Sequence, residues 1–89
     1  NEHLVKRAGH LERFDERKIY ASCYAACLSA HIKHNEAEKI CNNVCKEVKG
    51  WIKNKKKVTS KQIFNQVTNK IKKFNKEAAY MYFTHRDIS

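Results

Sequence analysis

Basic side chains near the start of the chain are grouped in a way that suits a polyanion. Lys6 and Arg7 are adjacent, and Lys18 follows at the start of a predicted helix. Cations that converge from adjoining elements bind phosphate groups through charge-assisted hydrogen bonds. The helix N-terminus adds a partial positive charge and unpaired N–H groups. A simpler interpretation stays open, in which these cations protect an exposed strand edge or pair with a surface acid such as Glu12.

The four cysteines form two pairs of equal spacing, Cys23 with Cys27 and Cys41 with Cys45, on consecutive predicted helices. If these helices run antiparallel about a turn centred near His34, Cys23 faces Cys45 and Cys27 faces Cys41. Such facing positions suit two disulfides in an oxidising compartment, or a four-cysteine metal site, although metal sites more often use loops with CxxC spacing. Because the cysteines coincide with the apolar helix faces, reduced thiols packed in the core are the simplest interpretation.

Apolar periodicity predicts the elements that must position these groups. Residues 4–14 alternate in character around Gly9, which predicts a β-hairpin. Asp15 is a suitable N-cap, and the stretches 35–38 and 59–62 have the pattern of a capping box. A short extended piece near Val58 separates two helical pairs, so the predicted fold class is α+β and mainly helical. The helices are expected at about 15–34, 35–52, 60–74 and 76–87.

Length and composition narrow the class of protein. Because the chain has 89 residues, we expect a single domain over residues 1–89. No apolar run reaches the ~20 residues of a membrane span, and no leader pattern is visible, so we expect no membrane partner and a cytoplasmic location. A P-loop and a recognisable set of nucleophile and base are both missing from the sequence, which argues against an enzyme.

The positive charge is concentrated in one segment. The net charge is +10, and residues 46–76 hold eleven lysines with Glu47 as their single acid. Such a segment attracts polyanions. With Trp51, Phe64 and Phe74 among the lysines, it supports an alternative function, a small basic helical protein that binds nucleic acid. In the simpler alternative, these lysines form a solvated surface without a binding role.

Three segments resemble the ATP-cone domain. The stretch 5–19, VKRAGHLERFDERKI, is similar to that family's opening hairpin and first helix. The stretch 58–63, VTSKQI, resembles its V-T-x-x-x-I, and the stretch 79–86, AYMYFTHR, is similar to its last helix. The segments follow the family's order across residues 4–87.

The resemblance implies a four-helix bundle capped by a small three-stranded sheet, made of the N-terminal hairpin and a short third strand. It implies a non-catalytic regulatory domain, of the kind found in ribonucleotide reductases and in the bacterial repressor of their genes. The implied ligand is ATP or deoxyATP, with Mg²⁺ as a candidate companion. The implied partner is a larger enzyme or a second copy of the chain.

The resemblance also implies the site. Glu12 accepts a hydrogen bond from the adenine amino group, the backbone of Val5 bonds the ring, and basic residues hold the phosphates. Two positions depart from the family: Ala8 replaces the usual aspartate of the hairpin turn, and Phe64 stands where a polar residue often faces the nucleotide. The implied nucleotide-binding residues are Val5, Lys6, Arg7, Glu12, Asp15, Lys18, Ile19 and Ser60.

Overall fold

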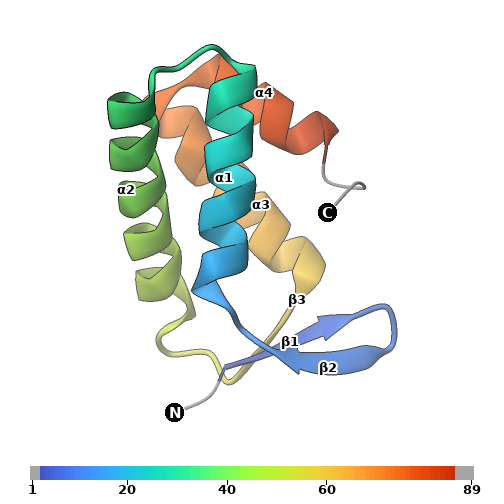
Figure 1. Cartoon of the computed structure of the whole chain (residues 1–89). Helices are drawn as coiled ribbons and strands as arrows, with labels where there is room; N and C mark the ends of the chain where they lie inside the picture. The colour runs from blue at the N-terminus through green and yellow to red at the C-terminus, as the bar shows by residue number, and fades with distance from the viewer. Residues whose placement is uncertain (1–2, 86–89) are drawn as a thin grey trace.

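The structure, a computed structural model, describes residues 3–85. In Figure 1 four helices stand together over a small sheet at the base of the molecule. The mainly helical α+β fold predicted from the sequence is confirmed. In chain order the elements are β1 (Leu4–Arg7), β2 (His10–Arg13), α1 (Glu16–Ser29), α2 (His34–Ile52), β3 (Lys57–Thr59), α3 (Ser60–Phe74) and α4 (Lys76–Thr84).

The sheet joins segments that are far apart in the sequence, in the order β2-β1-β3. Val5 on the central strand pairs antiparallel with Glu12 and parallel with Val58. The hairpin turn places Ala8 and Gly9 at φ +49° and +86°. Two successive residues with positive φ give the turn a twist that matches paired strands, and only the glycine adopts it without steric cost.

The turn between α1 and α2 differs from the prediction. Asp15 caps α1 as expected, and its side chain accepts a hydrogen bond from the Arg17 N–H at 3.0 Å. However, α1 ends at Ser29 and not near His34, because the next turn contains His31 in the left-handed region at φ +63°. Helix α2 then begins at His34, with Lys33 as an N-cap whose side chain makes no capping bond. The capping box predicted at 35–38 is therefore wrong.

The junctions around α3 follow the sequence closely. The Thr59 hydroxyl accepts from the Gln62 N–H at 3.0 Å, and the Gln62 side chain accepts from the Thr59 N–H at 2.9 Å. The predicted capping box is thus confirmed here. Asn75 ends α3 and caps α4 by accepting from the Ala78 N–H at 2.8 Å. Helix α4 is described to Thr84, and its predicted end at 87 lies outside the described residues.

The core lies between the sheet and the four helices. Val5 and Val58 contribute from the sheet, and the cysteines of α1 and α2 pack with the aliphatic residues of α2 and α3. Among the described residues no buried side chain is polar or charged. Within residues 3–85 no helix has the length and apolar character required to cross a bilayer.

Candidate functional site

A large cavity opens between the hairpin and the helices α1, α3 and α4. Its volume is about 1040 Å³, at the upper end of the usual range for small-molecule sites. Five residues predicted from the sequence line it: Arg7, Glu12, Lys18, Ile19 and Ser60. The fold therefore brings together residues from the hairpin, the first turn of α1 and the start of α3.

Glu12 connects the basic residues of this cavity. Its Oε1 atom lies 3.3 Å from Arg7 Nε and 3.8 Å from Lys18 Nζ, and its Oε2 atom lies 3.3 Å from His10 Nε2. The hydrogen bond to His10 is the largest cause that lowers the pKa of Glu12, and the charges of Lys18 and Arg7 act in the same direction. The two cations are thus held beside one carboxylate, at positions where a more highly charged anion can compete for them.

Three predicted residues do not line this cavity. Val5 is 2 % exposed and belongs to the core beneath the sheet. Because side chains alternate along a strand, Lys6 projects from the opposite face of β1 to Val5 and Arg7. Asp15 borders a different hollow. Of the cations predicted from the sequence, Arg7 and Lys18 are therefore the two that line the large cavity.

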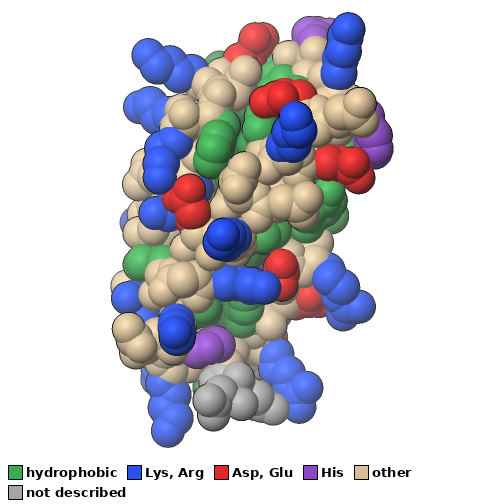
Figure 2. Space-filling view, turned by 90° about the vertical axis from the view of Figure 1, so that its left-hand side faces the viewer, with side chains coloured by type: hydrophobic (Ala, Val, Ile, Leu, Met, Phe, Trp, Pro, Cys, Tyr) green, Lys and Arg blue, Asp and Glu red, His purple; other side chains and the backbone are tan. Residues whose placement is uncertain are grey.

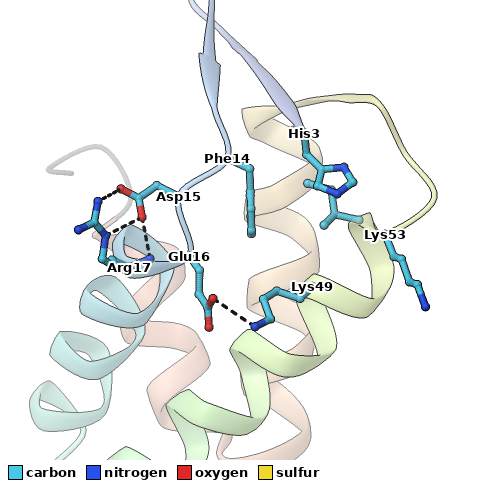
Figure 3. A pocket seen from close by; sticks show the side chains of 8 residues that line it. His3, Phe14, Asp15, Glu16, Arg17, Lys49 and Lys53 are labelled. Carbon is cyan, nitrogen blue, oxygen red and sulfur yellow. Dashed lines mark hydrogen bonds and ion pairs between the residues drawn. The ribbon is translucent and has the colours of Figure 1, made fainter. Parts of the chain in front are cut away.

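The second hollow, of about 510 Å³, lies where the start of α1 meets the end of α2 (Figure 3). Four of its charged side chains form ion pairs, with Asp15 Oδ1 at 3.1 Å from Arg17 Nε and Glu16 Oε1 at 3.3 Å from Lys49 Nζ. The hydrogen bond from the Arg17 side chain is the main cause that lowers the pKa of Asp15. Asp15 thus acts in this structure as the cap of α1.

Sequence reasoning missed much of the cavity's apolar wall. The sequence held a signal for this wall, because α1 has small side chains that recur at spacings of four, on a different face from the cysteines. Small residues there leave open space between α1 and α4. The α1 residues that line the cavity beyond Lys18 and Ile19 are Ala21, Ser22, Ala25, Ala26 and Ser29.

Aromatic rings form the wall contributed by α3 and α4. Phe64 is 8 % exposed and stacks on Tyr82, with ring centroids 5.3 Å apart and planes inclined by 19°. Burial raises the pKa of Tyr82 to about 12, so this phenol stays neutral at physiological pH. Lys61 and His85 also line the cavity. The cavity thus offers an apolar, partly aromatic side and a cationic side, which suits a ligand with a flat base and a polyanionic chain.

The cysteines lie in the core, where Cys27 and Cys41 are close together as predicted, but the predicted pairing of Cys23 with Cys45 is wrong. The Sγ atoms of Cys23, Cys27 and Cys41 all lie within 4.8 Å of one another. The Cys45 thiol instead donates to the Glu16 carbonyl oxygen at 4.0 Å. The structure therefore places Cys41, and not Cys45, beside Cys23. The reason is the early end of α1, which moves the centre of the turn from His34 to between residues 31 and 32. All four thiols are free.

The lysines of residues 46–76 are distributed over several elements. Figure 2 shows the face on which α2 lies, with basic side chains scattered across it and acidic ones between them. Glu47 pairs with Lys70 at 3.7 Å and with Lys73 at 2.9 Å. Trp51 packs against the core, with Lys55 Nζ 4.9 Å from the centre of its ring. On the face shown, the lysines therefore do not form one unbroken basic surface.

Comparison with known proteins gives one family. The model of the ATP cone domain matches residues 2–88. No curated protein and no solved structure matches the chain. The family match covers nearly the whole chain and includes the hairpin, the bundle and the large cavity. The chain therefore belongs to the ATP cone family, a family of regulatory, non-catalytic domains that bind ATP or deoxyATP.

Proposed function

We propose that this chain binds ATP or deoxyATP in the large cavity and acts as a nucleotide-responsive regulatory domain without catalysis of its own. The observation that carries the proposal is the placement of Arg7 and Lys18 beside Glu12 in the wall of a cavity of about 1040 Å³. A triphosphate carries more negative charge than one carboxylate, so it competes well for both cations.

The phosphates are assigned to the cationic side of the cavity. Arg7 supplies a planar guanidinium for two phosphate oxygens, and Lys18 supplies a point charge from α1. Ser60 and Lys61 stand at the N-terminal end of α3, where N–H groups and the helix dipole favour an anion. Lys6 projects from the other face of β1, so we assign it a long-range electrostatic role at most.

The base is assigned to the apolar side. Once the phosphates hold Arg7 and Lys18, Glu12 is available to accept a hydrogen bond from the adenine amino group. Tyr82, supported from behind by the nearly buried ring of Phe64, offers an aromatic side chain for contact with the base or sugar. Val5 supports this wall from beneath, as a buried residue of the central strand.

Mg²⁺ is expected to arrive with the triphosphate. Glu12 is the only carboxylate among the described residues that line the cavity, and it already faces three basic groups. Since Mg²⁺ prefers to keep several waters and to bind phosphate oxygens, the chain needs no dedicated ligand set for it.

We further propose a cytoplasmic location and, as the partner that responds to the bound nucleotide, a larger enzyme or a second copy of the chain.

Titration with a fluorescent ATP analogue tests the proposal. ATP and deoxyATP should compete with the analogue, whereas UTP and inorganic triphosphate should compete less well at moderate salt. Duplex DNA, titrated at two salt concentrations, tests the nucleic-acid alternative. Tight DNA binding with no preference among triphosphates would overturn the proposed function.

A further inference from the structure

The antiparallel pair α1 and α2 buries a compact group of three sulfur atoms. Cys23 and Cys27 lie one helical turn apart on α1, and Cys41 faces them from α2. Each of the three residues is 0 % exposed, and their Sγ atoms all lie within 4.8 Å of one another. Ordinary packing of core thiols does not require three sulfurs from two helices to converge on one point.

The spacing suits a single metal ion. With metal–sulfur bonds of about 2.3 Å, three sulfurs arranged around one ion lie about 4 Å apart. The observed limit of 4.8 Å is close enough for small side-chain rotations to complete such a site. The described core holds no buried polar or charged side chain, so sulfur is the ligand type that the core side chains offer. A set of thiolates selects soft ions over Mg²⁺ or Ca²⁺.

The metal ligand is the thiolate and not the thiol, so the three clustered thiols lose their protons when an ion binds. The fourth cysteine lies outside this group. Cys45 differs, because burial raises the pKa of its thiol to about 11 and its Sγ atom contacts the Glu16 carbonyl.

We propose that Cys23, Cys27 and Cys41 form a three-thiolate binding site for a soft d¹⁰ metal ion, with Zn²⁺ as the representative. Binding replaces three S–H bonds by three metal–sulfur bonds, releases three protons and leaves a complex of one negative charge with Zn²⁺. The net charge of +10 lowers the cost of that charge. Because the site is fully buried, the ion enters as the two helices close on each other, so metal binding is linked to folding.

Metal analysis of the refolded chain tests the site. The reduced protein is refolded with Zn²⁺ or with a chelator, freed of excess metal, and assayed for zinc and for thermal unfolding. We expect about one zinc per chain and a higher melting temperature for the zinc-loaded form. Cys27→Ala should lose the metal, whereas Cys45→Ala, which removes another buried thiol outside the group, should retain it. If Cys45→Ala also loses the metal, the three-thiolate site is wrong and a four-cysteine site replaces it.

A second measurement does not depend on the variants. Refolding of the wild-type chain with Co²⁺ should give sulfur-to-cobalt charge-transfer absorption whose intensity corresponds to about three thiolates. A wild-type chain that binds neither Zn²⁺ nor Co²⁺ after reduced refolding, while it still binds ATP, would overturn the metal site alone.

Discussion

Lys18 Nζ on α1 lies 3.8 Å from Glu12 Oε1 on β2, so an ion pair joins the hairpin to the first helix. Both side chains line the large cavity. An exposed pair of this kind adds little to the free energy of unfolding. Its effect is on orientation, because in the absence of ligand the carboxylate holds the lysine near the place where we propose the phosphates bind.

The first prediction concerns the phosphate cations. Arg7→Ala and Lys18→Ala should each weaken ATP binding by about 1–3 kcal/mol, because each removes a charged hydrogen-bond donor, which corresponds to roughly a 5- to 150-fold rise in Kd. Lys39→Ala, which removes an exposed lysine of α2 outside the cavity, is the matched control and should leave Kd unchanged. Lys6→Ala should raise the Kd for ATP less than Arg7→Ala, the other variant on the hairpin. Unchanged affinity in both Arg7→Ala and Lys18→Ala would exclude the assigned site.

The second prediction separates base recognition from attraction of polyanions. Lys55, Lys56 and Lys57 carry part of the excess charge but do not line the large cavity. Their joint replacement by Gln should leave the preference for ATP over UTP nearly unchanged at physiological salt, where the Debye length is ~8 Å. Competition titrations at low and moderate salt measure this preference. If the triple variant loses the preference, the base is not read in the cavity.

The third prediction concerns the hairpin turn. Ala8 adopts φ +49°, which costs an alanine steric strain. Ala8→Asn should therefore raise the free energy of unfolding by about 0.5–1 kcal/mol, since Asn-Gly is the preferred pair for this turn. Gly9→Ala should lower the free energy of unfolding by about 1 kcal/mol or more. Backbone strain is the whole cause, because an added Cβ at Gly9 meets no atom within 4 Å. Urea unfolding of the three proteins measures both effects, and a destabilised Ala8→Asn variant would contradict the strain argument.

The fourth prediction is a dependence on pH. The pKa of Glu12 is lowered below 4.5 in the folded state, chiefly by the hydrogen bond to His10. Glu12 therefore contributes stability that is present above its unfolded pKa and is lost as pH falls through its folded pKa. Urea unfolding from about pH 6 to about pH 3 should show a shallower loss of stability for Glu12→Gln than for the wild type. Parallel curves for the two proteins would mean that the pairs around Glu12 do not form in solution.

The bounds of a helix could be predicted from the sequence where local signals and tertiary packing agree. Helix α3 begins and ends as predicted, because the Thr59–Gln62 capping box and an apolar face of regular spacing specify the same segment. The end of α1 was missed because no glycine or proline marks it. Its stop depends on His31 in a left-handed conformation, which is uncommon for residues other than glycine and is not indicated by its neighbours.

That error propagated to the cysteines, since the register of two antiparallel helices depends on where the turn between them lies. A shift of the turn toward the N-terminus placed Cys41, and not Cys45, beside Cys23. The candidate site was predicted better on the hairpin than on the helices. Arg7 and Glu12 belong to a continuous motif, whereas Tyr82 and His85 reach the cavity from α4 through tertiary packing that the sequence does not show.

The parallel pairing of β1 with β3 has a consequence for the order in which the protein is made. A ribosome delivers the hairpin first, yet β1 gains its second neighbour only after Val58 has emerged. Contacts between such distant segments form late, because closing the long loop between them costs entropy before the contacts stabilise the fold. The helical pair α1–α2 can close during synthesis, whereas the large cavity also needs α4 and is completed last. Nascent chains that stop short of α4 should thus fail to retain ATP, so nucleotide capture would report that synthesis of the domain is complete.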